Sequence, residues 1–388
     1  MNFGAMSLFS ALGDLFLIGA VLGSIFTLIE CVCVVRYPRE RAGANAGPLP
    51  PVTVLKPLHD DEPGLGNRLA QLCAQKYDAP LQIIFGIRDA AAPVVKLARE
   101  TQAAFPNLAI DVVVDPRRHG SNGKVSNLIN MVAHARHDTL VLSDSDIMVG
   151  PDYLRRVVGL LGSPLVGAAT CLYFGVGKGL WTGLSALSIN AHFLPQALVA
   201  ARFQLEQHCC GATIVLPRSM LDRIGGFDAF ADELADDHAI GAAVRKAGYD
   251  IVTAPFLVGH CCFETTLHEL FSHQLRVSRT IKSITPFGYA GTVITHPLPL
   301  ALLGALGGGT GAAAIVATAL IFRVILCRCV EWRFGLPRQS PWLVAFYDLI
   351  AFGAYVASYF GTTVTWAGSD YDVTSEGTLI ERETEEAA

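Results

Sequence analysis

The sequence predicts an α/β domain with a mostly parallel sheet, and membrane-spanning helices on its N- and C-terminal sides. Between residues 51 and 146, apolar segments typical of strands alternate with segments of helical spacing, as in parallel sheets covered by helices on both faces. Hydrophobic residues make up 52% of the 388-residue chain and charged residues only 16%. A soluble core does not need so large an apolar excess, so part of the chain is expected in a membrane.

The first apolar segment, residues 6–35, predicts an N-terminal transmembrane anchor. Residues 15–29 carry no charge, and the whole segment is long enough to cross a bilayer. It has neither a basic start nor a small-residue cleavage signature, so we expect a retained anchor and not a cleaved signal peptide. Arg36, Arg39 and Arg41 follow directly, and by the positive-inside rule they predict a cytoplasmic location for the next domain.

Residues 50–282 predict that cytoplasmic domain. The apolar segments expected as its first strands are residues 52–55, 81–85, 110–114 and 139–142, with helical spacing at residues 66–76, 93–104 and 124–135. Ligands of parallel sheets bind at the carboxyl ends of the strands. Lys56, Asp89 and the pair Asp144 and Asp146 follow three of these strands. An active site is therefore expected at this edge, although a single charged residue after a strand is often merely solvated.

Asp144 and Asp146 form the most informative motif. They follow a buried strand and are separated by Ser145, so their side chains can project to the same side. Two carboxylates suit Mg²⁺ or Mn²⁺, and a cation held by few protein groups keeps positions open for phosphate oxygens. The alternative is a polar turn, in which Asp and Ser are common.

Three further charged residues could take part. Lys124 ends a Gly-rich turn at a predicted helix start, a place that suits a phosphate. Asp236 and Asp237 open a later helix, where carboxylates stabilise the helix N-terminus. A carboxylate beside a metal-bound leaving group could instead deprotonate an attacking hydroxyl.

Residues 179–201 are uncharged and would look like a span in isolation. A single crossing there would place Asp144 and Asp236 on opposite sides of the membrane. We therefore expect an amphipathic, membrane-facing segment where a lipid could approach, with a buried core helix as the alternative.

The C-terminal part predicts more membrane structure. Arg276 lies in a basic segment that suits lipid headgroups or, through its guanidinium fork, a diphosphate. Residues 284–366 then predict a membrane region, with a hairpin over residues 286–322 and a last span over residues 342–366. Residues 367–388 predict an acidic tail, and disorder is expected from Glu376 to Ala388.

The net charge argues against nucleic-acid binding, and the cysteine pattern argues against a zinc site or a disulfide framework. A formal net charge of -5 gives no reason to expect nucleic acid as a partner. The ten cysteines form no CxxC pairs, so a zinc site or a disulfide framework is not expected.

Asp89, Asp144-Ser145-Asp146, Asp236-Asp237 and Arg276 occur in this order, and with them the chain resembles the ceramide glucosyltransferase-like family. These are glycosyltransferases of family 21, related to family 2, with a GT-A fold. The resemblance covers about residues 10–310. Residues 211–214, 225–231 and 295–300 are most similar to the branch of bacterial hopanoid-biosynthesis glycosyltransferases.

The resemblance implies a membrane-bound inverting glycosyltransferase of the bacterial inner membrane. It would move glucose or N-acetylglucosamine from a UDP-sugar to a hydroxyl of a ceramide-type or hopanoid lipid, with Mn²⁺ or Mg²⁺ as cofactor. The implied roles are Asp89 on the uracil, Asp144 and Asp146 on the metal, Lys56, Lys124 and Arg276 on the nucleotide, and Asp237 as general base.

The chain departs from the family pattern at the last motif. The segment His273-Gln274-Leu275-Arg276-Val277 has neither Gln nor Arg at its first place and no Trp at its last. Two other functions stay open. One is a processive polysaccharide synthase, and the other is a non-catalytic membrane scaffold with a GT-A fold.

Overall fold

The computed structural model describes residues 3–38, 48–59, 62–205, 209–308, 311–366, 369–374 and 378–381. The chain forms two compact units, each assembled from separate parts of the sequence. The sheet unit contains Pro38–Val176, Gln204–Phe263 and Gly377–Ala388. The helical unit contains Met1–Tyr37, Gly177–Phe203 and Glu264–Glu376. Residues 177–203 and 264–282, which we expected in the catalytic domain, therefore pack with the helices.

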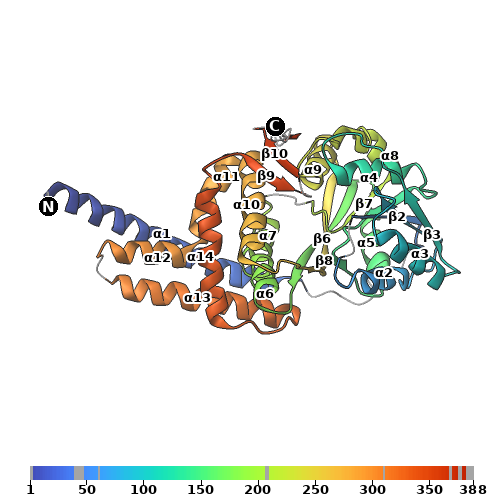
Figure 1. Ribbon diagram of the computed structural model, residues 1–388. Helices are drawn as coiled ribbons and strands as arrows, with labels where there is room; N and C mark the ends of the chain where they lie inside the picture. The colour runs from blue at the N-terminus through green and yellow to red at the C-terminus, as the bar shows by residue number, and fades with distance from the viewer. Residues whose placement is uncertain are drawn as a thin grey trace, which may run out of the picture. The chain divides into compact units, whose positions relative to one another are not determined.

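One eight-stranded sheet organises the sheet unit, in the order β3-β2-β1-β4-β7-β6-β8-β5 (Figure 1). The first four strands are β1 (Val52–Leu58), β2 (Leu81–Ile87), β3 (Ala109–Val114) and β4 (Thr139–Leu142). β1 pairs in parallel with β2 and β4, and β2 pairs in parallel with β3. Because Val52 lies beside both Leu81 and Thr139, the carboxyl ends of these strands line one edge, as the sequence predicts.

Helices cover both faces of the sheet and bury two hydrophobic cores. The helices on one face are α2 (Leu65–Cys73), α3 (Val94–Ala104) and α5 (Tyr153–Val158), followed by a short 3₁₀ turn (Gly159–Leu161). Those on the other face are α4 (Gly123–Val132), α8 (Arg218–Arg223), a 3₁₀ turn (Phe227–Phe230) and α9 (Asp236–Lys246). Strand residues alternate between these cores, with Val54 in the first and Leu55 in the second.

The second half of the sheet returns distant segments to the edge where the acidic residues lie. Its strands are β5 (Ile147–Met148), β6 (Val166–Val176), β7 (Ile214–Pro217) and β8 (Asp250–Cys261). β7 pairs antiparallel with β4, and β5 pairs antiparallel with β8. This last pairing sets Ile147 opposite His260, directly after the acidic turn Asp144-Ser145-Asp146.

The helical unit is built around α1 (Phe3–Arg36), which packs against α12 (Pro297–Leu306) and α13 (Ala312–Phe334). Its other helices are α6 (Leu180–Ser188), a π-helical turn (Ile189–Phe193), α7 (Leu194–Arg202), α10 (Leu267–Ile284), α11 (Pro286–Gly291), a 3₁₀ turn (Thr292–Thr295) and α14 (Pro341–Ala357).

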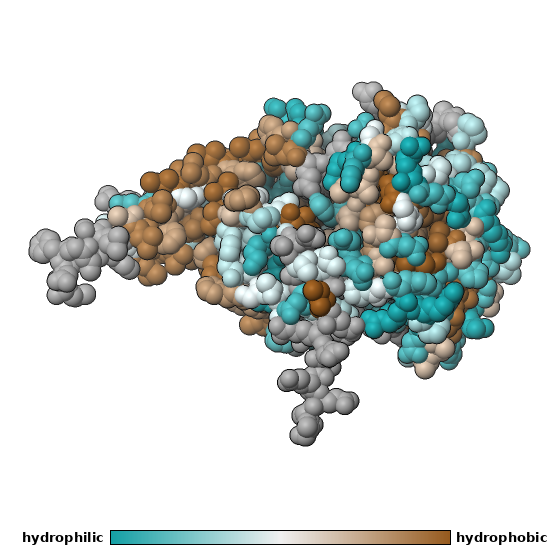
Figure 2. All heavy atoms as spheres, turned by 90° about the horizontal axis from the view of Figure 1, so that it is seen from above, coloured by the Kyte–Doolittle hydropathy of each residue, from teal (hydrophilic) through white to brown (hydrophobic). Residues whose placement is uncertain are grey.

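Three described helical segments are long and apolar enough to cross a membrane: Ser10–Arg36, Leu180–Arg202 and Ala312–Phe334. A fourth could come from Pro286–Thr295 and Pro297–Leu306, which are bent by 70°. Large apolar side chains are exposed along two of these helices, among them Leu15, Ile18, Leu22 and Ile321. Figure 2 shows the resulting hydrophobic surface in brown. Leu180–Arg202 is instead 78% buried, which favours the buried-helix alternative for this segment.

The helices of the C-terminal region end at other residues than predicted. α13 continues past Phe322 because Arg323, expected to begin a loop, is buried and forms a bidentate ion pair with Asp348 at 2.8 and 2.9 Å. α14 ends at Ala357, short of Trp366. Thr363, Val364 and Thr365 are all β-branched, and such residues favour a strand. The strand β9 (Thr363–Trp366) begins there.

The predicted acidic tail, residues 367–388, is described in part. Residues 369–374 contain β10 (Ser369–Val373), which pairs antiparallel with β9, and residues 378–381 contain β11 (Leu379–Glu381). The rest of the predicted tail lies outside the described residues.

Candidate active site

Lys124 joins two acidic segments that are about ninety residues apart in the sequence. Its ammonium lies 2.8 Å from Asp144 Oδ1 and 3.1 Å from Asp236 Oδ2. It occupies the first turn of α4, where the Asn122 side chain accepts a hydrogen bond from the Val125 amide and caps the helix. The N-terminus of α4 thus carries a partly buried cation between two carboxylates.

Asp237, the predicted general base, is held by backbone amides. Gly211 N donates to its Oδ2 at 2.8 Å, and His238 N donates to its Oδ1 at 2.7 Å. Burial raises the pKa of the Asp237 carboxyl, and so does the adjacent Asp236, while Lys124 and the amides act in the opposite direction. A raised pKa suits a general base, because a more basic carboxylate accepts a proton more readily.

Gly211 lies at the centre of these groups, and sequence reasoning missed its role. A Cβ atom added there would lie 3.0 Å from Asp144 Oδ2, 3.1 Å from Lys124 Nζ and 3.5 Å from Asp237 Oδ2. The sequence marks Gly211 only through the resemblance of residues 211–214, and nothing local predicts its neighbours, which it acquires through the pairing of β7 with β4.

His260 is the second residue that sequence reasoning missed. Its Nε2 lies 3.1 Å from Asp146 Oδ2, and the Tyr173 ring stacks on it with centroids 5.3 Å apart. Asp146 holds the pKa of His260 well above its usual range, although burial alone would lower it. No local motif marks this histidine, because β5–β8 pairing alone brings it to the acidic turn.

Lys56 lies beneath the acidic turn and is 1% exposed. Its ammonium donates to the Asp144 carbonyl and lies 3.3 Å from Ser143 Oγ. Burial lowers the pKa of Lys56 to about 8, although Asp146 and Asp144 act to raise it. Lys56 therefore supports the backbone of the turn from inside the sheet unit.

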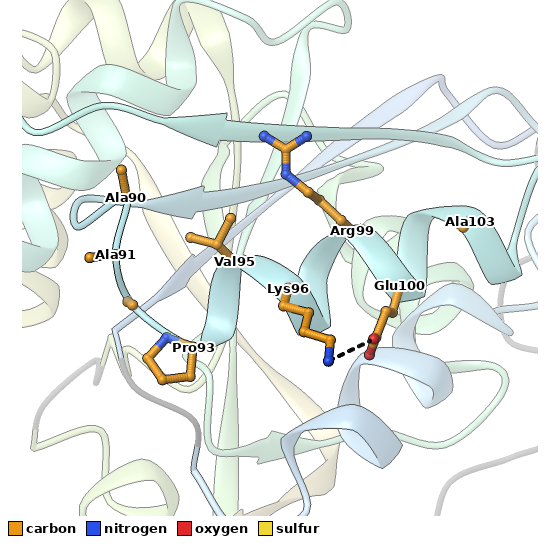
Figure 3. Close-up of a pocket in the computed structure, with 9 residues that line it drawn as sticks. Ala90, Ala91, Pro93, Val95, Lys96, Arg99, Glu100 and Ala103 are labelled. Carbon is orange, nitrogen blue, oxygen red and sulfur yellow. Dashed lines mark ion pairs between the residues drawn. The ribbon is translucent and has the colours of Figure 1, made fainter.

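Asp89 follows β2 in an exposed turn, where its Oδ1 accepts a hydrogen bond from the Ala91 amide at 2.8 Å. The residues after it line an open pocket of about 570 Å³ at the start of α3. Figure 3 shows this pocket with its alanines and the Lys96–Glu100 ion pair. The pocket contains none of the predicted site residues, and the contact of Asp89 with uracil stays a prediction.

Arg276 belongs to the helical unit, on α10. It is largely buried, which lowers its pKa, while the charge of Glu264 opposes that effect. Glu264 also pairs with His273, the residue at the first place of the altered motif. The predicted contact of Arg276 with a diphosphate likewise stays a prediction.

A family model described as Glycosyl transferase family 21 matches residues 15–379. The chain belongs to glycosyl transferase family 21. The family expected from the acidic motifs is thereby confirmed.

Two curated relatives of this family 21 protein act in lipid glycosylation by their names. Ceramide glucosyltransferase 1 of Caenorhabditis elegans is 22% identical over 202 residues, which are 52% of this chain and 43% of that protein. Beta-monoglucosyldiacylglycerol synthase of Synechocystis is 25% identical over 196 residues, 49% of this chain and 40% of that protein. The matched region is thus less than half the length of each relative.

A solved structure supports the fold of the family 21 chain. The mannosyltransferase PcManGT from Pyrobaculum calidifontis, in complex with GDP-Man and Mn²⁺, has a TM-score of 0.57 at 18% identity. The match covers 91% of this chain and 99% of that one. The predicted GT-A fold is confirmed.

The acidic turn of the family 21 protein fits a hard divalent cation. Within the described residues, no three His, Cys, Asp or Glu side chains are arranged to hold a metal, and Asp144 and Asp146 are paired with Lys124 and His260 instead. Asp146 Oδ1 is nevertheless buried without a hydrogen-bond partner among the described residues. Such an unpaired carboxylate oxygen is costly unless a ligand satisfies it, and carboxylate oxygens are the donors that Mn²⁺ and Mg²⁺ prefer.

Proposed function

We propose that this family 21 protein is a membrane-bound inverting glycosyltransferase that transfers a sugar from a UDP-sugar to a hydroxyl of a membrane lipid. One observation carries the proposal: Asp144, Asp236 and Asp237 meet around Lys124 and Gly211 in a single, partly buried cluster. Clusters of titratable groups with shifted pKa values are typical of sites that bind a cation and transfer a proton.

The roles follow from the positions of the side chains. Asp144 and Asp146 would hold Mn²⁺ or Mg²⁺, which when bound would neutralise charge on the departing diphosphate. Lys124 can then turn from Asp144 to a phosphate oxygen, because it stands at the N-terminus of α4, where anions are stabilised. Lys56 keeps the turn in place.

Asp237 is the proposed general base. Its two amide hydrogen bonds fix the orientation of the carboxylate, and its raised pKa favours removal of a proton from the acceptor hydroxyl. The hydroxyl oxygen then attacks the anomeric carbon while the bond to the diphosphate breaks, through an oxocarbenium-like state. One such displacement inverts the anomeric centre.

The acceptor is proposed to arrive from the bilayer. The helical unit exposes apolar side chains along α1 and α13, as a unit within a membrane does. The two relatives are named for ceramide and diacylglycerol products, and a ceramide-type or hopanoid hydroxyl is the acceptor we propose here. Glucose and N-acetylglucosamine are the candidate sugars. The basic residues after α1 favour a cytoplasmic sheet unit, at the inner membrane of a bacterium.

The test is transfer by membranes that contain the protein. Labelled UDP-glucose and UDP-N-acetylglucosamine are offered with ceramide, diacylglycerol and hopanoid acceptors, and products are identified by mass spectrometry. A single sugar on a lipid is the expected product. A polymer would instead indicate a polysaccharide synthase, and absence of UDP binding with Mn²⁺ would indicate a scaffold.

The Asp237→Asn variant tests the mechanism. Loss of the base should reduce kcat roughly 10²- to 10⁴-fold, while UDP binding in the presence of Mn²⁺, measured by calorimetry, stays the same. The Asp228→Asn variant, altered at an exposed aspartate of the same unit, serves as the control. Wild-type turnover by Asp237→Asn would exclude Asp237 as the base.

A further inference from the structure

A closed ring of three side chains holds the middle of the acidic turn. Arg68, on α2, donates from Nε to the Ser145 carbonyl at 2.9 Å. The other side of its guanidinium pairs with Glu62 Oε2 at 2.6 Å. Ser145 Oγ closes the ring by donating to Glu62 Oε1 at 2.5 Å. Ser145 thus contacts both partners, through its carbonyl and through its hydroxyl.

Arg68 is the buried member of the ring, and it is held by further contacts outside the turn. Arg68 is 3% exposed, and its guanidinium lies over the Phe263 ring at 5.2 Å from the centroid. Arg68 NH1 also donates to the Pro63 carbonyl at 2.8 Å, so the loop after β1 is tied to the same group. A planar guanidinium that makes contacts on three sides leaves little freedom to its neighbours.

All three carbonyls of the acidic turn are held in this way. The Asp144 carbonyl accepts from Lys56, the Ser145 carbonyl from Arg68, and the Asp146 carbonyl from the Cys261 amide at 3.0 Å. Because these hydrogen bonds occupy the backbone carbonyls, the carboxylates of Asp144 and Asp146 are the groups of the turn that can bind a ligand.

We propose that Arg68 and Glu62 are positioning residues, which preorganise the acidic turn for the divalent cation and the diphosphate that it binds. This inference rests on the proposed function and deepens it. Neither residue need contact metal or substrate. Partners that orient metal ligands in this way typically change metal affinity about 10- to 100-fold when they are replaced.

The experiment measures Mn²⁺ affinity directly, from the electron paramagnetic resonance signal of free Mn²⁺, with the purified full-length protein in detergent. Ser145→Ala removes one bond of the ring, and Arg68→Lys keeps the charge but not the fork. We expect both to weaken Mn²⁺ binding about 10- to 100-fold. Ser145→Thr, which keeps the hydroxyl, should restore the affinity, and saturating Mn²⁺ should restore kcat in all three.

The control variant is Arg136→Gln, which removes an exposed Arg–Asp pair with Asp111 on the same sheet and should leave Mn²⁺ affinity unchanged. The unfolding temperature and metal-free UDP binding separate positioning from general damage, because positioning leaves both unchanged. If Ser145→Ala binds Mn²⁺ as tightly as the unmodified protein, the inference is wrong, even where Arg68→Lys fails to fold. If the unmodified protein itself binds no Mn²⁺ with UDP present, the proposed function fails first.

Discussion

At the scale of single residues, the site depends on a position that has no side chain. Gly211 donates its amide to Asp237 and leaves room for Asp144 and Lys124 on its other side. Two carboxylates and an ammonium group therefore converge on the space that a Cβ atom of this residue would occupy. A side chain at this position would occupy the space that the Asp144 carboxylate and the Lys124 ammonium need.

Gly211→Ala should disturb this convergence without unfolding the sheet. The new methyl would lie 3.0 and 3.1 Å from Asp144 Oδ2 and Lys124 Nζ, so at least one of them has to shift. We expect a loss of about 10- to 100-fold in Mn²⁺ affinity, as for other changes that displace a metal ligand. Titration of Mn²⁺ against both proteins measures it.

The matched control is Gly150→Ala in the same unit, where an added Cβ meets nothing within 4 Å. It should bind Mn²⁺ as the unmodified protein does. Equal affinity for Gly211→Ala and Gly150→Ala would contradict the role given to Gly211.

The sequence could predict the carboxylates of the site but not their neighbours. Asp144 and Asp146 are recognisable in the sequence because they follow a predicted strand with one residue between them. Asp236 and Asp237 are recognisable because they begin a predicted helix. His260 lies in an apolar segment without any local pattern, and the resemblance of residues 211–214 gives Gly211 no role. Their roles come from β5–β8 and β4–β7 pairing, which are contacts over a long sequence separation.

At the scale of elements, α1 relies on small residues to approach its neighbours closely. A Cβ at Gly23 would lie 2.2 Å from the Ile294 carbonyl oxygen and 3.1 Å from Pro297 Cβ. Gly13 faces Gly307 in the same way further along α1. Without a hydrophobic driving force inside a bilayer, such close backbone contact is a main source of helix association.

Gly23→Ala should therefore destabilise the helical unit. Overpacking costs about 1–3 kcal/mol, so the unfolding temperature in detergent should fall. Gly291→Ala, in α11 of the same unit, is the control, since nothing lies within 4 Å of its added Cβ. An unchanged unfolding temperature for Gly23→Ala would show that α1 does not need this contact.

Element boundaries in this unit were also the least predictable. A charge such as Arg323 normally marks the end of an apolar span, and the hairpin was predicted to end before it. In the structure, Asp348 neutralises that charge, and His192 of the π-helical turn adds a contact to Asp348 at 2.9 Å. Partners on other helices thus decide where a span ends, and hydropathy does not contain this information.

At the scale of the whole molecule, the apolar surface predicts how the protein behaves in cells. Exposure of the Leu, Ile and Val side chains of α1 and α13 to water would be unfavourable in free energy. We expect the protein to stay in the membrane pellet after an alkaline carbonate wash and to be released by detergent. Immunoblotting of the two fractions is the measurement, with a peripheral membrane protein as control. Release by carbonate alone would argue against transmembrane helices.

The composition predicted a membrane part and the alternation of segments predicted the sheet, but neither predicted how the chain is divided between them. Gly177–Phe203 was assigned to the catalytic domain by its place in the sequence, and it packs with the helices. Its apolar character fits either location equally well.

The division of the chain has a consequence for biosynthesis. The polypeptide passes from one unit to the other at Tyr37, Val176, Phe203 and Phe263. A ribosome releasing it from the N-terminus must deliver α1 and residues 177–203 long before α13 and α14, their later neighbours, exist. The eight strands can join once Phe263 has emerged, while the lipid-embedded part waits for another hundred residues. We therefore expect the sheet unit to be complete before the helical unit during synthesis.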